Sequence, residues 1–178
     1  MDVLVTDRLE LLPITRALVD AVVEGKRADA EDICRARFPE IWPGRALVER
    51  AFACPLDKLR EDPQSWLWGA RVLVSRGGPR CVVGSVVLDG KPNPETGSVE
   101  VAYGIDGAHQ GHGYATEGTR AVVEWALGQR EVNRVTASTF PWHSASLRVL
   151  RKVGMEEIGT RETEMFGDLV VYARARNM

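Results

Sequence analysis

Hydrophobic and polar residues alternate along several stretches of the chain, and this period of two predicts β-strands. In residues 8–14, Leu9 and Leu11 alternate with charged neighbours, and Pro13 suggests an edge position because it has no backbone N–H to donate. Alternating or valine-rich runs predict six further strands, at residues 68–75, 81–89, 98–105, 132–139, 156–165 and 169–174. Gly167-Asp168 is a candidate tight turn for the last hairpin.

Apolar residues spaced three and four apart predict helices between these strands. Thr15 can cap a helix that runs to about Glu24, where Gly25 ends it. Helices are also expected at residues 114–127 and 144–153, the second ended by Gly154. One or two helical pieces are expected in residues 28–62, including helical spacing across 45–59 that Pro55 interrupts.

The order of elements predicts an α/β fold. Hairpins alternate with crossover helices, so the sheet should be mixed rather than purely parallel. The chain of 178 residues suits a single domain with one sizeable core, and we expect that domain to span residues 1–178.

Composition and charge remove several classes of function. The net charge of −2 argues against a nucleic-acid surface, which usually needs a concentrated basic face. No apolar run approaches the roughly 20 residues of a spanning helix, and the N-terminus lacks a secretory pattern, so we expect a cytoplasmic protein away from the membrane. Cys34, Cys54 and Cys81 are odd in number and widely spaced, which favours reduced thiols.

The segment 105–117 carries the most informative chemistry, because it joins a strand to a helix through glycines. Gly111 and Gly113 allow a tight turn and close approach to a ligand, and the helix behind offers unpaired N–H groups. Together they predict an anion site suited to a pyrophosphate, with a ligand-free turn as the alternative. A P-loop would need a lysine here, and a dinucleotide fingerprint would need a third glycine where Thr116 stands.

Two ordered motifs show a family resemblance. Gln110, Gly113 and Ala115 fill the pattern Arg/Gln-x-x-Gly-x-Gly/Ala, and residues 143–155 are similar to Asn-x-x-Ser followed by Val-Leu-x-Lys-x-Gly-Phe. Further matches lie at residues 6–11 and 99–103. With these motifs the chain resembles the GNAT N-acetyltransferase superfamily, closest to the branch of the ribosomal-protein N-terminal acetyltransferases. The resemblance implies the GNAT fold, a mixed, mostly antiparallel sheet that is flanked by helices and splays where the cofactor arm inserts.

The resemblance also implies acetyl-CoA as co-substrate and no metal. The pyrophosphate would lie on backbone N–H groups of residues 111–115, and the pantetheine arm would pair with the strand end at 103–105. A backbone N–H there would face the developing oxyanion. The cofactor-binding residues that it implies are Tyr103, Gly104, Ile105, Gln110, Gly111, His112, Gly113, Tyr114, Ala115, His143 and Ser146.

The sequence departs from the family pattern at two points. His143 stands where the family has an asparagine that contacts the pantetheine, and its reach differs. Many relatives carry a tyrosine on the same helix as the acid for the departing thiolate. Leu150 stands near that point, which makes Ser146 the nearest remaining hydroxyl and a catalytic candidate.

Glu100 is the candidate general base. It alternates with Val99 and Val101 and should face away from them, either as a base or as a solvated or paired carboxylate. The three histidines lack the acidic or cysteine partners of a metal site, and we expect His109 and His112 to be exposed loop residues. Trp142 is a candidate for the wall of the acceptor pocket, with ordinary packing as the alternative.

The expected reaction is direct attack of a primary amine on the thioester, without a covalent enzyme intermediate. By resemblance, the acceptor is a peptide or protein N-terminus, and a small amine such as an antibiotic or polyamine is the alternative. A non-catalytic acyl-CoA-binding module is a third interpretation. Helices and loops of residues 15–65 should form the acceptor wall, and a homodimer stays open as the assembly.

Overall fold

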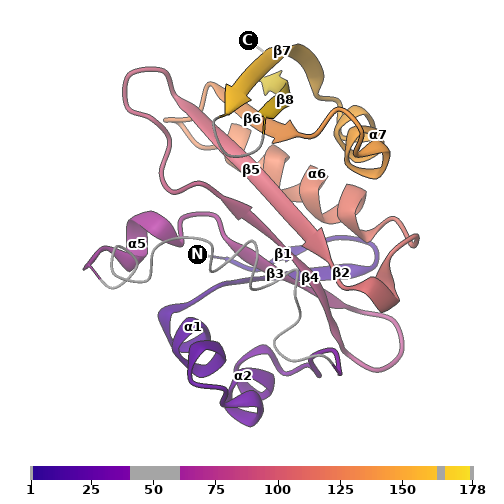
Figure 1. Ribbon diagram of the computed structural model, residues 1–178. Helices are drawn as coiled ribbons and strands as arrows, with labels where there is room; N and C mark the ends of the chain where they lie inside the picture. Colours follow the sequence, from indigo (N-terminus) through magenta and orange to yellow (C-terminus); the bar gives the residue numbers. More distant parts are fainter. Residues whose placement is uncertain (1, 41–60, 164–166, 177–178) are drawn as a thin grey trace.

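The computed structural model describes residues 2–40, 61–163 and 167–176, and these residues build one eight-stranded sheet with helices on both faces (Figure 1). The strands are β1 (Leu4–Val5), β2 (Leu9–Pro13), β3 (Arg71–Ser75), β4 (Val82–Leu88), β5 (Ser98–Ile105), β6 (Arg134–Thr139), β7 (Glu156–Thr163) and β8 (Gly167–Ala175). The helices are α1 (Arg16–Val23), α2 (Arg27–Cys34), α5 (Pro63–Trp66), the 3-10 turn η1 (Gly107–His109), α6 (Tyr114–Leu127) and α7 (Ser144–Val153). The strand order is β1-β2-β3-β4-β5-β6-β8-β7.

The sheet is mixed and mostly antiparallel, which confirms the predicted fold class. Neighbouring strands pair antiparallel except β5 and β6, which run parallel. Parallel neighbours need a crossover connection, and α6 supplies it. In Figure 1, β5 runs diagonally between the strands β1 to β4 and the strands β6 to β8.

The sheet opens between β5 and β6. Their pairing starts at Ser98 with Arg134 and ends at Glu100 with Thr136. Beyond that point β5 continues to Ile105, still paired with β4, while β6 continues to Thr139, paired with β8 but no longer with β5. The opening lies where the resemblance places the cofactor arm, so the predicted splay is present.

Two hydrophobic cores lie on opposite faces of the sheet. The first packs β-strand residues such as Leu73 and Val101 against α6 and α7, and the second packs Val72 and Val74 against α1 and α2. A Cβ atom at Gly118 of α6 would lie 2.8 Å from the Leu73 side chain, so the glycine lets this helix sit directly on the sheet. Both faces of β3 and β4 are therefore buried.

Local helix signals agree with the structure. The Thr15 side chain accepts a hydrogen bond from the Leu18 N–H at the start of α1, as expected for an N-cap. Gly154 ends α7 with φ of +83°, in the left-handed region that favours glycine. The helices at 114–127 and 144–153 have the predicted bounds.

Three strand predictions need correction. β2 is not an edge strand, because β1 lies outside it; β1 pairs only with Glu10 and Leu11, so Pro13 lies beyond its end. The strand predicted from residue 68 begins at Arg71, after a turn at Gly69 with φ of +71°. Gly167-Asp168 is not the hairpin turn, because both residues belong to β8 and pair with β7.

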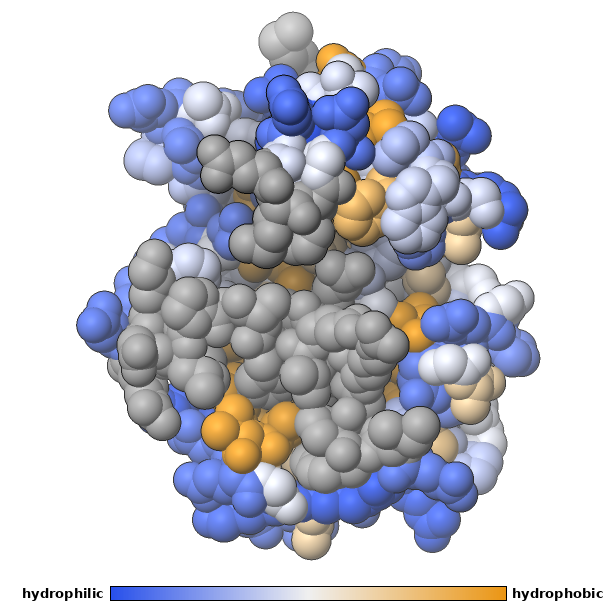
Figure 2. All heavy atoms as spheres, viewed as in Figure 1, coloured by the Kyte–Doolittle hydropathy of each residue, from blue (hydrophilic) through white to orange (hydrophobic). Residues whose placement is uncertain are grey.

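Some expectations concern residues outside the described ranges, and the expectation about the membrane can be compared only with the described helices. The helical spacing at residues 45–59, together with Cys54, lies outside the described ranges. No helix among the residues that the structure describes combines the length and apolar character needed to cross a membrane. Hydrophilic residues dominate the visible rim of the molecule, with hydrophobic residues in separate patches (Figure 2).

Candidate active site

The loop between β5 and α6 has the geometry of an anion site. Gly111 and Gly113 have φ of +80° and +82°, a backbone conformation that residues with a side chain rarely adopt. Gly113 is the N-cap of α6 and supplies no capping side chain, so the N–H groups of Gly113, Tyr114 and Ala115 have no intrahelical acceptor. Unpaired donors of this kind and the positive end of a helix dipole can bind phosphate oxygens.

Arg8 supports this loop from the start of the chain. Its Nη1 donates to the His112 carbonyl at 2.8 Å, and its guanidinium lies 5.1 Å from the centre of the Tyr114 ring. Its Nε donates to Glu117 Oε2 at 2.7 Å. This role of Arg8 was not predicted from the sequence. The only signal was the family match at residues 6–11, because the partners lie more than a hundred residues away.

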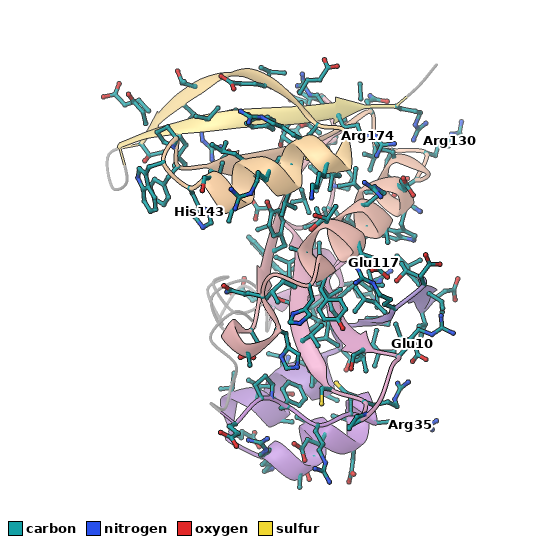
Figure 3. The ribbon with its side chains drawn as sticks, turned by 90° about the vertical axis from the view of Figure 1, so that its right-hand side faces the viewer. Glu10, Arg35, Glu117, Arg130, His143 and Arg174 are labelled. Carbon is teal, nitrogen blue, oxygen red and sulfur yellow. The ribbon has the colours of Figure 1, made fainter. Side chains whose placement is uncertain are left out.

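Glu117, in the first turn of α6, is the carboxylate that Arg8 contacts (Figure 3). Its carboxylate accepts from Thr6 Oγ1 at 2.6 Å and from the Arg8 backbone N–H at 2.9 Å. Burial raises the pKa of Glu117, but the hydrogen bonds from Thr6 and Arg8 outweigh it and hold the pKa below its ordinary value. The ionised carboxylate therefore ties the N-terminal segment to the helix that begins the loop site.

A surface cavity of about 480 Å³ adjoins the loop. It lies between the N-terminal segment, α6 and the end of α7, and Gly113 is part of its wall. Three basic side chains line it beside three acidic ones: Arg8, Arg120 and Lys152 with Asp7, Glu117 and Glu124. The cavity gives the loop site room for more than a phosphate group.

The edge of β5 presents backbone groups to the opening in the sheet. Asp89 N–H donates to the Glu100 carbonyl and Asp106 N–H donates to the Val83 carbonyl, so even-numbered residues of β5 face β4. By alternation, the N–H and C=O groups of Tyr103 and Ile105 face the β6 side, beyond the last paired residues.

The residues flanking this edge take different positions. Gly104 lies in register with Ser85, so its backbone groups face β4 and not the opening. Gln110 Nε2 donates to the Ile105 carbonyl at 3.0 Å, which ties the loop to the strand end. Of the predicted pantetheine segment, Tyr103 and Ile105 therefore present their backbone toward the opening.

His143 caps α7, at the position labelled in Figure 3. Its Nδ1 accepts the Ser146 N–H at 3.1 Å, which requires the ring proton on Nε2. An asparagine oxygen can accept the same hydrogen bond, since asparagine is a preferred N-cap residue. Trp142 is 72% exposed among the described residues and stacks on Phe140, with ring centroids 4.8 Å apart, so its place in the wall of an acceptor pocket stays a prediction.

Ser146 contacts Tyr103 across the opening. The two hydroxyl oxygens are 2.8 Å apart, and the tyrosine oxygen is also 3.2 Å from the Ser146 carbonyl oxygen. A role was predicted for the backbone of Tyr103 but not for its hydroxyl. Leu150 is 1% exposed and packs in the core, so the helix position where relatives carry a tyrosine faces away from solvent here.

Glu100 has a charged partner. Val99 and Val101 pack in the core beneath α6, and Glu100 faces the opposite side of the sheet, as predicted. Its two carboxylate oxygens lie 3.3 and 3.4 Å from the guanidinium of Arg161 on β7. The side chain of Glu100 is 30% exposed. Glu100 is thus a paired carboxylate that solvent still reaches.

The remaining histidines and Cys34 differ in exposure and in chemical environment. His109 is half-buried, with its Nδ1 3.0 Å from Asp106 Oδ2, so the expectation of an exposed residue was wrong for it; His112 is exposed. Within residues 2–40, 61–163 and 167–176, no three His, Cys, Asp or Glu side chains cluster closely enough to hold a metal ion. Burial raises the pKa of the Cys34 thiol to about 12, which keeps it neutral.

A family model described as "Acetyltransferase (GNAT) domain" matches residues 8–156, and this range includes the loop, β5 and α7. The chain belongs to the GNAT acetyltransferase family. The GNAT domain of this chain is similar over most of its length to the Bacillus subtilis "Uncharacterized N-acetyltransferase YjdG", with 26% identity across 86% of this chain and 89% of the relative. Two other curated relatives from the same organism match over only 33% of their own length.

Two solved structures share the GNAT fold. The Vibrio fischeri "Ribosomal-protein-S5-alanine Acetyltransferase" superposes with a TM-score of 0.67 at 17% identity, covering 99% of this chain and 98% of that one. The second is "RimL- Ribosomal L7/L12 alpha-N-protein acetyltransferase in complex with Coenzyme A", with a TM-score of 0.63 at 16% identity and 98% coverage of both chains. At these identities the likeness shows a shared fold.

Proposed function

We propose that this chain transfers the acetyl group of acetyl-CoA to a primary amine by direct attack. The observation that carries this proposal is the loop of Gly111 and Gly113, with both glycines at positive φ before an uncapped helix N-terminus. Such a loop binds a pyrophosphate through backbone donors. It adjoins both the cavity beside Gly113 and the opening between β5 and β6.

Acetyl-CoA would lie along these features in order. Its pyrophosphate would accept hydrogen bonds from the backbone of residues 111–115. The pantetheine arm would enter the opening and pair with the edge of β5 at Tyr103 and Ile105. A backbone N–H on this edge would then face the thioester oxygen as it becomes negatively charged, which stabilises the tetrahedral intermediate. His143 and Ser146 would flank the sulfur end from the start of α7.

Glu100 is the proposed general base. An acceptor amine is mostly protonated near neutral pH and must lose a proton before it attacks. Glu100 can take that proton directly or through water, and positioned bases of this kind contribute about 10²- to 10⁴-fold to rate. Arg161 pairs with the carboxylate of Glu100, and an incoming ammonium would compete with it for the same two oxygens.

A peptide or protein N-terminus is the proposed acceptor. The support is family membership, together with the names of the two structural neighbours, which describe acetyltransferases of ribosomal proteins S5 and L7/L12. Glu100 lies on the sheet face that also carries α1 and α2, which supports residues 15–65 as part of the acceptor wall. Small amines are the competing acceptors in the test below.

Acetyl-CoA binding tests the loop first. At 100 times its Kd, a ligand adds about 2.7 kcal/mol to the free energy of unfolding. For a domain of this size, that corresponds to a rise in melting temperature of roughly 5–10 °C. We expect Gly113→Leu to abolish the rise. Gly78→Leu is the matched control, because Gly78 also has positive φ, at +68°, but lies in the turn before β4.

Release of free CoA tests the reaction. Wild-type protein would be mixed with acetyl-CoA and, separately, peptides that begin with alanine or serine, N-terminally blocked peptides, polyamines and an aminoglycoside. Release with free but not blocked N-termini supports the proposed acceptor, and release only with the small amines refutes it. Binding of acetyl-CoA without release from any acceptor would identify a non-catalytic acyl-CoA-binding module.

A further inference from the structure

Tyr103 and Ser146 form a hydroxyl pair that joins the two sides of the opening. Tyr103 comes from β5 and Ser146 from the first turn of α7. Their hydroxyl oxygens are 2.8 Å apart, a normal hydrogen-bond length for two hydroxyls. Both side chains are partly buried, and the contact lies past the last paired residues of β5 and β6.

The positions of the two hydroxyl protons determine what this pair can do. The phenol has one proton, which it can donate to Ser146 Oγ at 2.8 Å or to the Ser146 carbonyl at 3.2 Å, and in the second case Ser146 donates to the phenol oxygen. When Tyr103 donates to Ser146 Oγ, the proton of Ser146 is free to point elsewhere. The backbone N–H of Ser146 is already held by His143 Nδ1, which fixes the helix end that carries the hydroxyl.

A serine hydroxyl alone is a poor acid for a departing thiolate. An alkyl hydroxyl loses its proton about as reluctantly as water, which is a far weaker acid than a thiol or a phenol. Thiols and phenols have pKa values of about 8.5 and 10. A phenol can therefore supply a proton to a thiolate at little cost, whereas a serine can do so only if it regains a proton in the same step.

We propose that Tyr103 is a positioning residue that protonates the CoA thiolate through Ser146. This inference rests on the proposed acetyl transfer. As the tetrahedral intermediate collapses, the C–S bond breaks and its electron pair goes to sulfur. The Ser146 proton moves to sulfur, the Tyr103 proton moves to Ser146 Oγ, and the phenolate takes a proton from water. The products are the acetylated amine and CoA thiol.

No other tyrosine can fill this role. The chain has three tyrosines. Tyr114 stacks with His112 and lies under the Arg8 guanidinium, on the loop side. Tyr172 donates to Glu157 Oε2 at 3.2 Å between β8 and β7. Tyr172 is 2% exposed, so Tyr172→Phe removes a buried phenol hydroxyl that contacts Glu157 rather than Ser146, and it is the matched control.

The test measures kcat for the wild type, Tyr103→Phe, Ser146→Ala, the double variant and Tyr172→Phe. We expect each single change at the pair to lower kcat about tenfold, with KM for acetyl-CoA within about twofold. Because both residues act in one relay, the double variant should be no slower than the slower single variant. Tyr172→Phe should keep the wild-type kcat, and melting temperatures would confirm that all variants fold.

A second readout separates a relay from a structural contact. Single-turnover rates in mixtures of H2O and D2O should curve with deuterium content in the wild type, because two protons move together, and should become linear in Tyr103→Phe. Multiplicative losses in the double variant, or a wild-type kcat in Tyr103→Phe, would overturn the relay while leaving acetyl transfer intact. Absence of CoA release from the wild type would remove the proposed function and the relay with it.

Discussion

Replacing Glu117 by glutamine tests how the N-terminal segment holds the loop site. The Glu117→Gln side chain would keep the same size and one acceptor oxygen but lose the negative charge. The amide that replaces Oε2 would also point its own donors toward the Arg8 guanidinium, which now donates to that oxygen at 2.7 Å. The change therefore removes the ion pair and places the amide N–H donors of glutamine opposite the N–H donors of Arg8.

The expected loss follows from these contacts. Hydrogen bonds to charged groups contribute about 1.5–3 kcal/mol each. The Thr6 and Arg8 backbone contacts to Oε1 can survive, so the loss is that of the Arg8 pair, and Arg8 is half exposed. Allowing for solvent screening, we expect about 2 kcal/mol. In a domain of this size that lowers the melting temperature by roughly 4–8 °C.

The effect should depend on pH in one direction. The pKa of Glu117 is lowered in the folded protein, whereas glutamate in the unfolded chain titrates at about 4.3. The stabilisation is therefore complete above that value and is lost as the pH falls through the lower, folded-state pKa. The difference in melting temperature between wild type and Glu117→Gln should shrink below about pH 4.

Thermal unfolding followed by circular dichroism, from about pH 3 to about pH 7, measures both effects. Glu124→Gln is the control on the same helix, because Glu124 is 55% exposed and its nearest cation, on Arg174, is 3.8 Å away. Its change should stay within about 0.5 kcal/mol. If Glu117→Gln is no less stable than Glu124→Gln near neutral pH, Glu117 does not anchor the segment.

Substitutions at Glu100 and His143 test the two residues that we propose act near the thioester, and each has a matched comparison variant. Glu100→Gln should lower kcat roughly 10²-fold with an unchanged acetyl-CoA Kd. Arg161→Gln is the comparison variant, because it removes the charged partner and leaves the Glu100 carboxylate in place. An unaltered rate and pH profile in Glu100→Gln would exclude Glu100 as the base. His143→Asn should keep the acetyl-CoA Kd or improve it, because asparagine preserves the cap, whereas His143→Ala should cost about 1 kcal/mol of stability. A tenfold weaker Kd in His143→Asn would show a specific role for the imidazole.

Local signals in the sequence predicted much of the fold. Thr15 and Gly154 were assigned correctly because capping depends on the few residues around each helix end. The two loop glycines were identified for the same reason, since positive φ is a local demand. Gly167 was misassigned because glycine favours turns on its own, and only the register with β7 shows that it lies in a strand.

The contacts that complete the candidate site were beyond such reasoning. Arg8 meets Glu117, Glu100 meets Arg161 and Tyr103 meets Ser146 only after the sheet has assembled, across separations of 109, 61 and 43 residues. The residues next to a charged side chain in the sequence do not show which distant residue it will pair with. The sequence therefore predicted the backbone segments of the candidate site, but not the side-chain pairs that these segments bring together.

The short junction between β5 and β6 has a consequence for the order of folding. Strands β3, β4 and β5 form antiparallel neighbours over short connections, and so do β7 and β8. The parallel junction must instead close a loop that contains all of α6, and it gains only three paired residues in return. Closing a longer loop loses more chain entropy, and this loss comes before the contacts between the paired strands can offset it. We therefore expect the boundary of the opening to be the last part of the sheet to form and the first to separate under denaturant.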